Sequence, residues 1–456
     1  MTSSFPFLKT TLKADLDGPP RKASDVLSLP IPANTPVPEL PLPPRDPKSF
    51  APGYTVSSHI FPGAYPRYSF LEPKRWLATS IPIINDAPPD SASKATRAKW
   101  ALNKRDALLE KSLQIYRART QNVPQDGPGE KEGLGPVTWN TVNRYARVSK
   151  PTAGDKRTGL TVISFHANGL HKETFEPTYR LIISLCDQPT SNVRVDEFWS
   201  LEAANTADGA LINGDVFGDY QDGIDHFRDT LNFLEHYLPQ APLASFPVHL
   251  ERHDKVAGYP TRFVVGLGHS FGGAVLSNAA CCQPSVFRSL TLIEPVLLQN
   301  ADLGLIGLAL ATLSRRESWK SREQAKSLLE QHPLFMTWTP EALDLYVRYA
   351  LRDAPGGGVT LKMSRFDEGA MLSHATSYVE TWALMETLPT SVRLRWITAE
   401  YPGLGSVETV HNLVWLRKGN TSNIIVPDGM HFLVQQKPEV VGKCLLPSTP
   451  CHSSLK

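Results

Sequence analysis

From Gly159 onward, the chain alternates short runs of β-branched and aliphatic residues with longer amphipathic segments. This alternation is typical of a mostly parallel sheet whose strands are joined by crossover helices. The runs predict strands at residues 160–165, 193–199, 262–267, 290–293 and 392–398, and a last strand that ends near 426. Helices are expected at 222–238 and 438–446. We therefore expect an α/β fold, with a mostly parallel central sheet flanked by helices.

Residues 295–389 interrupt this alternation, because apolar residues recur there at helical spacing over 303–313, 320–331 and 340–350. The pattern predicts a helical lid inserted before the penultimate strands. Two uses are open for each apolar side chain of this stretch: lining a substrate pocket, or packing the lid on the core. The side chains in question are Leu303, Leu305, Ile306, Leu308, Leu310, Phe335, Met336 and Trp338.

The part before residue 136 differs from the rest of the chain. Residues 1–53 are rich in proline, which predicts an extended and poorly ordered arm that lies over the domain as a linker or binds a proline-recognition module. Residues 54–135 form an extension with a short strand at 54–60 and a basic helix at 94–120; a further strand is expected at 142–148. The basic residues form a solvated helix face or contact an acidic partner or membrane surface. The core is then divided into 136–294 and 390–456 by the lid.

Charge and cysteine content exclude several classes of function. The 456 residues include 47 Lys and Arg against 45 Asp and Glu, a net charge of +2, so nothing favours nucleic acid as a partner. Five cysteines without a C-x-x-C pair argue against a disulfide framework and a structural zinc site. We also find no transmembrane run and no secretory signal. No metal or organic cofactor is expected, and the sequence does not fix the oligomeric state.

The strongest chemical signal is Gly268-His269-Ser270-Phe271-Gly272-Gly273, which lies between a predicted strand and a helix-compatible segment. A serine at the tip of a tight strand-to-helix turn needs small neighbours two residues away on each side, because the backbone is strained and closely packed there. Such a turn exposes the serine hydroxyl and directs the N–H of Phe271 to the place where an oxyanion would form. Ser270 is therefore the candidate nucleophile.

A second oxyanion donor is expected just after the strand at 160–165, in the segment His166-Ala167-Asn168-Gly169-Leu170. Gly169 permits a sharp turn beside a ligand, and the candidate donors are the N–H of Asn168, the N–H of Leu170 and the side-chain amide of Asn168. We interpret His166 as a residue that fixes this turn through a hydrogen bond.

A serine needs a base, and the order in this architecture is serine, acid, histidine. His431 follows the last predicted strand in Asp428-Gly429-Met430-His431 and is the preferred base. The acid is Glu294, which ends the strand at 290–293, or Glu400, which ends the next one; we favour Glu294.

These motifs resemble the α/β-hydrolase superfamily, and more narrowly a fungal branch with the AK-toxin and AF-toxin biosynthesis hydrolases and the yeast peroxisomal lipase. The resemblance rests on four segments in the same order, namely His166-Ala167-Asn168-Gly169 with Lys172-Glu173, the Ser270 motif, Ile293-Glu294-Pro295 and Gly429-Met430-His431. Members of that branch often end in a peroxisomal address, whereas this chain ends in Ser454-Leu455-Lys456. We expect an intracellular protein of the cytoplasm or the peroxisome.

The sequence thus predicts a serine hydrolase, of the esterase or lipase kind, for a carboxylic ester or thioester with an apolar acyl group. Ser270, His431 and Glu294 would form the triad, with oxyanion donors at Phe271 and at Asn168 or Leu170. Two alternatives use the same fold: a non-catalytic protein that binds a small apolar ligand or a partner chain, and a lyase acting on a C–C bond.

Overall fold

The computed structural model describes residues 16, 18–41, 45–68, 92–96, 98–100, 103, 136–152, 154–217, 221–300, 303–372 and 375–445. Most of the predicted basic helix at 94–120 lies outside these ranges, as do residues 1–15 of the predicted arm and residues 446–456.

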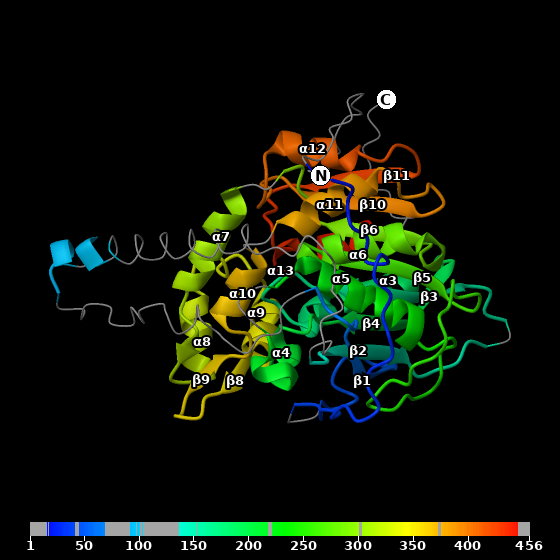
Figure 1. Cartoon of the computed structure of the whole chain (residues 1–456). Helices are drawn as coiled ribbons and strands as arrows, with labels where there is room; N and C mark the ends of the chain where they lie inside the picture. Colours follow the sequence, from blue (N-terminus) through cyan, green and yellow to red (C-terminus); the bar gives the residue numbers. More distant parts are fainter. Residues whose placement is uncertain are drawn as a thin grey trace.

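An eight-stranded sheet forms the centre of the described structure, with strand order β1-β2-β4-β3-β5-β6-β10-β11 (Figure 1). Its strands are β1 (Tyr54–Pro62), β2 (Trp139–Arg147), β3 (Thr158–Phe165), β4 (Val193–Leu201), β5 (Phe263–His269), β6 (Ser289–Ile293), β10 (Arg393–Ala399) and β11 (Thr421–Val426). The six strands from β4 to β11 run parallel, whereas β2 is antiparallel to both of its neighbours. The predicted fold class is confirmed, and the predicted strands are present with ends shifted by at most three residues.

Successive residues of the central strands pack on opposite faces of the sheet, as the two-residue period of a strand requires. On β3, Leu160 and Val162 belong to one buried apolar cluster, while Ile163 and Phe165 belong to the other. Because both faces are covered, β3 carries buried apolar side chains on both of its faces rather than on one.

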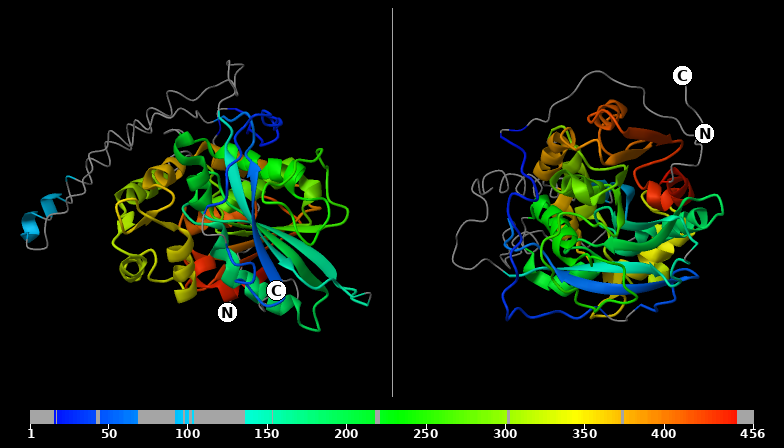
Figure 2. Two further views of the ribbon diagram at one scale, coloured as in Figure 1. Left: turned by 90° about the horizontal axis from the view of Figure 1, so that it is seen from below. Right: turned by 90° about the vertical axis from the view of Figure 1, so that its right-hand side faces the viewer.

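Two layers of helices cover the sheet (Figure 2). One face carries α3 (Glu176–Cys186) and α14 (Pro438–Leu445), which contact each other. The other carries α5 (Gly223–Asn232), α6 (Phe271–Cys282) and α11 (Thr376–Met385). A π-helical turn, Phe233–Tyr237, continues α5, so the helix expected at 222–238 is confirmed.

The insertion between β6 and β10 holds helices and a small sheet on one side of the core (Figure 1). Its helices before α11 are α7 (Leu303–Ser314), α8 (Arg322–Leu329), α9 (Pro340–Tyr349) and α10 (Arg365–Leu372). The small sheet has the order β7-β9-β8, with β7 (Ser318–Trp319), β8 (Leu351–Asp353) and β9 (Val359–Leu361). The sequence did not predict this sheet, because its strands of two and three residues are too short to show a period. We call residues 303–372 the lid.

The described part of the proline-rich segment contacts the core helices. Arg21 pairs with Asp222 at 2.7 Å and with Glu380 at 2.6 Å, and the N–H of Ala23 donates to the side chain of Asn278. This segment therefore lies over the layer formed by α5, α6 and α11. Within the described ranges, no helix combines the length and the apolar character that crossing a bilayer requires.

Candidate active site

Ser270 occupies the tight turn between β5 and α6. Its backbone has φ 55° and ψ −119°, a conformation that residues other than glycine rarely adopt. A Cβ atom on Gly272 would lie 2.1 Å from the carbonyl oxygen of Phe165, and one on Gly268 would lie 2.6 Å from the carbonyl oxygen of Gly272. The backbone is thus packed too closely for larger residues, which explains the glycines of the motif.

His431 lies in the loop after β11, and its Nε2 is 2.8 Å from the hydroxyl oxygen of Ser270. Both side chains are largely buried; 18% of the His431 side chain is exposed. The distance is that of a hydrogen bond, and a neutral imidazole would accept the hydroxyl proton in it. The two residues are 161 positions apart in the chain, and the structure brings them together above the same sheet edge.

The carboxylate of Glu294 lies on the other side of the imidazole. Its Oε2 is 3.5 Å from Nδ1 of His431, while Oε1 accepts the N–H of Ala399 at 2.7 Å. Glu400, the other candidate acid, is exposed, and its Oε2 accepts the N–H of Asp428 at 2.8 Å. Of the two glutamates, only Glu294 is within ion-pair distance of His431 among the described residues.

The candidate oxyanion donors separate into two groups. Phe271 is the first residue of α6, so its N–H has no acceptor in its own helix, and Phe271 and Asn168 both line the cavity beside Ser270. The N–H of Leu170 instead donates to the carbonyl oxygen of Ala167 at 3.1 Å, and its side chain packs in the apolar cluster of the lid. This corrects the expectation for Leu170, because a donor used in a local turn does not face the cavity.

The loop that holds Asn168 is fixed by His166, which supports the interpretation of that residue. Its Nδ1 lies 2.7 Å from the carbonyl oxygen of Ala167, and its Nε2 is 3.3 Å from the hydroxyl of Thr206. Burial lowers the pKa of His166 to about 3, so the ring is neutral and donates one hydrogen bond while it accepts another.

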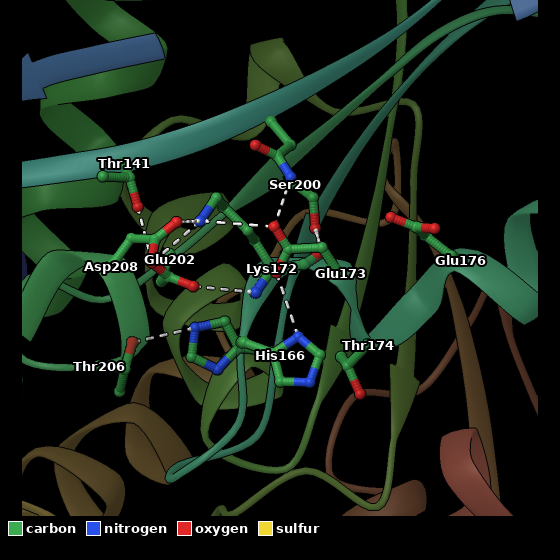
Figure 3. A network of polar contacts seen from close by, with 12 residues as sticks. Thr141, His166, Lys172, Glu173, Thr174, Glu176, Ser200, Glu202, Thr206 and Asp208 are labelled. Carbon is green, nitrogen blue, oxygen red and sulfur yellow. Dashed lines mark hydrogen bonds and ion pairs between the residues drawn. The ribbon is translucent and has the colours of Figure 1, made fainter. Parts of the chain in front are cut away.

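A buried network of charges follows this loop directly (Figure 3). The ammonium group of Lys172, on a side chain that is 1% exposed, lies 2.5 Å from Asp208 and 3.3 Å from Glu202. Burial opposes the charged form of this lysine, but the neighbouring carboxylates of Asp208, Glu173 and Glu202 outweigh it and raise the pKa. Lys172 is therefore a permanent cation that ties the loop to the end of β4 and to α4 (Ala207–Asn213).

Two residues near His431 were missed by sequence reasoning. The Nε2 of His269 lies 2.8 Å from the carbonyl oxygen of His431, and burial lowers the pKa of His269 to about 3, so the neutral ring donates this bond from Nε2–H. Gly403 packs against the imidazole itself: a Cβ atom there would lie 2.4 Å from Cβ of His431. No local pattern marks either role, because both depend on a contact between distant segments.

A cavity of about 800 Å³ opens beside Ser270 and His431, between the core and the lid. Its apolar lining includes Val296, Leu305, Leu308, Leu372, Tyr378 and Phe432. Polar residues also line it, namely Arg315, Arg316, His332, Thr337, Glu368 and Gln436. A cavity of this size and lining accommodates a mostly apolar ligand.

The apolar lid residues singled out in the sequence have different surroundings. Leu305 and Leu308 line the cavity, whereas Phe335 and Trp338 pack within the lid. Met336 is 63% exposed. The side chains of Leu303, Ile306 and Leu310 lie outside the described part. Among the described residues, no group of three or more His, Cys, Asp or Glu side chains is arranged to hold a metal ion.

Comparison with known proteins gives relatives in fungi, while no protein-family model matches the chain. The type I acyl-CoA thioesterase mpaH of Penicillium roqueforti is 28% identical over 219 residues, 46% of this chain and 45% of that protein. The abhydrolase domain-containing protein AFT2-1 of Alternaria alternata is 27% identical over 213 residues, 39% of this chain and 79% of that protein. The alignment thus spans less than half the length of mpaH.

Among solved structures, the peroxisomal α/β-hydrolase Lpx1 of Saccharomyces cerevisiae superposes with a TM-score of 0.57 and 16% identity. The superposition covers 70% of this chain and 84% of Lpx1. The chain therefore has the α/β-hydrolase fold, and its sequence relatives include fungal proteins of that superfamily.

Proposed function

We propose that this chain is a serine hydrolase that cleaves a carboxylic ester or thioester with an apolar acyl group. The observation that carries the proposal is the 2.8 Å distance between the Ser270 hydroxyl and Nε2 of His431 beside an apolar cavity. A serine hydroxyl becomes a useful nucleophile when a base accepts its proton at this distance.

In the proposed reaction, the oxygen of Ser270 attacks the acyl carbon while its proton moves to Nε2 of His431. The carbonyl oxygen becomes an oxyanion that accepts hydrogen bonds from the N–H groups of Phe271 and Asn168. His431 then returns the proton to the departing alcohol or thiol, which leaves an acyl-serine. A water molecule, deprotonated by His431, attacks this ester, and Ser270 regains its proton as the acid product leaves.

Glu294 is the proposed acid of the triad. Its carboxylate faces the His431 nitrogen that is distant from the serine, where it would favour the tautomer with the proton on Nδ1 and stabilise the imidazolium. The N–H groups of Ala399 and Gly403 bind the two carboxylate oxygens at 2.7 and 3.4 Å and hold the side chain in this orientation.

A thioester is favoured over an oxygen ester by the name of the mpaH relatives, which are described as acyl-CoA thioesterases. The cavity supports an apolar acyl group, and the exposed Arg316 at its rim suits an anionic leaving group such as coenzyme A. The substrate is therefore proposed as an acyl-CoA or a related thioester.

The test is a hydrolysis assay with acyl-CoA and p-nitrophenyl esters of increasing chain length, run on wild type and Ser270→Ala. We expect hydrolysis by wild type that rises with acyl length until the cavity is filled, and a loss of about 10³-fold or more in the variant. Failure of the folded wild type to hydrolyse any member of either series, with intact binding of the acyl chain, would instead support a non-catalytic ligand-binding protein.

A further inference from the structure

A short segment of the lid, residues 362–368, is connected to the loop that carries Asn168 in two ways: through Asp208 and Lys172, and by a direct contact of Glu368. The segment joins β9 to α10 and includes the start of that helix. The chemistry proposed above makes no use of either contact.

The first contact is a carboxylate shared by two lysines. Asp208, on α4, accepts from the ammonium group of Lys172 at 2.5 Å and from that of Lys362 at 2.6 Å. Lys172 begins the short 3-10 helix Lys172–Phe175 that follows the Asn168 loop, and Lys362 belongs to the lid, so Asp208 joins these two segments. The side chains of Asp208 and Lys362 are only 19% and 13% exposed, so solvent screens this pair less than it would screen a surface ion pair.

The main chain of Lys172 is bonded to residues at the end of β4. Its N–H donates to Glu202 at 3.1 Å, and its carbonyl oxygen accepts from the hydroxyl of Ser200 at 2.6 Å (Figure 3). The side chain and the main chain of Lys172 are thus both fixed, four residues after Asn168.

The second contact places Glu368 on the turn of the loop. The side-chain amide of Asn168 donates to the carbonyl oxygen of Glu368 at 3.2 Å, and a Cβ atom on Gly169 would lie 2.6 Å from the carboxyl carbon of Glu368. Arg315 forms an ion pair with this carboxylate. Gly169, with φ +74°, leaves room for the glutamate as well as permitting the turn.

We propose that Lys362 and Glu368 are positioning residues: docking of this lid segment fixes the loop so that the N–H of Asn168 faces the reacting carbonyl. The inference rests on the proposed function. Its consequence is that the lid completes the oxyanion hole in addition to covering the substrate.

A displaced oxyanion donor weakens binding of the transition state more than binding of the substrate. We therefore expect kcat to fall while KM stays nearly unchanged. Complete loss of one donor typically lowers kcat by about 10²–10³-fold. For Lys362→Gln, which loosens the loop without removing the donor, we expect kcat to fall by roughly tenfold with KM changed by less than about twofold.

The matched control is Glu341→Gln. Glu341 on α9 forms an ion pair with Arg180 on α3, which also joins the lid to the core but does not touch the Asn168 loop. We expect Glu341→Gln to keep the kcat of wild type and Lys362→Arg, which retains the charge, to recover most of it. The double variant Asp208→Asn/Lys362→Gln should lose no more than the stronger single variant, because Asp208→Asn already weakens the link that Lys362→Gln breaks.

The measurements are kcat and KM with a p-nitrophenyl ester, the thermal midpoint of each variant, and stoichiometric labelling of Ser270 by a fluorophosphonate. Complete labelling of wild type separates this test from failure of the proposed function itself. Equal kcat values for Lys362→Gln and Glu341→Gln, an effect confined to KM, or additive losses in the double variant would overturn the proposal.

Discussion

Gly403 lies against the imidazole ring of His431, so replacing this glycine by alanine changes the geometry of the proposed triad through one added methyl group. The methyl carbon would lie 2.4 Å from Cβ, 2.7 Å from Cγ and 3.0 Å from Nδ1 of His431. Carbon atoms in contact are normally about 3.5–4.0 Å apart, so the ring or the loop must move by roughly 1 Å. A movement of this size is enough to lengthen the 2.8 Å hydrogen bond between Nε2 of His431 and the Ser270 hydroxyl beyond hydrogen-bond distance.

A displacement of about 1 Å between reacting groups typically lowers the rate by roughly 10²-fold. We therefore expect Gly403→Ala to lower kcat/KM for the ester or thioester by that factor and to slow fluorophosphonate labelling of Ser270 in parallel. The control is Gly356→Ala, because a Cβ atom on Gly356 meets no atom within 4 Å and its backbone does not have a positive φ. Activity of Gly403→Ala within threefold of wild type, at an unchanged thermal midpoint, would refute the reasoning.

Three further predictions follow from the same geometry. Ser270→Gly should raise the free energy of unfolding by about 1 kcal/mol relative to Ser270→Ala, because only glycine adopts φ 55° and ψ −119° without strain; urea titration measures this difference, and equal midpoints would contradict it. Glu294→Gln should lower kcat by about 10²-fold or more while Glu400→Gln changes it by less than about threefold; equal and mild effects would reject Glu294 as the acid. Burial lowers the pKa of His166 and His269 to about 3 and that of His226 to about 4, so below the unfolded value of about 6.5 only the unfolded chain binds these protons. The free energy of unfolding should then fall by up to about 2 kcal/mol per histidine between pH 7 and pH 5, and equal urea midpoints at the two pH values would contradict this.

The order of the central elements was predictable because long apolar strands and amphipathic helices carry clear periods. The Ser270 turn was predictable because its glycines are required by local packing, and the whole motif lies within six consecutive residues. The similarity to fungal α/β-hydrolases is confirmed by the mpaH and AFT2-1 matches and by the superposition on Lpx1.

Features that depend on contacts between distant segments were not predictable in the same way. Glu294 and Glu400 both end strands at one sheet edge, and only the arrangement in space shows which of them faces His431. The sequence offers Asn168 and Leu170 equally as oxyanion donors, and only the structure shows that the N–H of Leu170 is already bonded within a local turn. The lid boundaries, the arm and the location in the cytoplasm or the peroxisome stay predictions.

The most direct test of the central claim is chemical identification of the nucleophile. The full chain is treated with a fluorophosphonate, digested and analysed by mass spectrometry, with folded Ser270→Ala as the control. We predict one phosphonyl adduct per wild-type chain, on the peptide that contains Ser270, and no adduct at any site in the variant. A folded wild type that carries no adduct, or carries it on a different residue, would contradict the account.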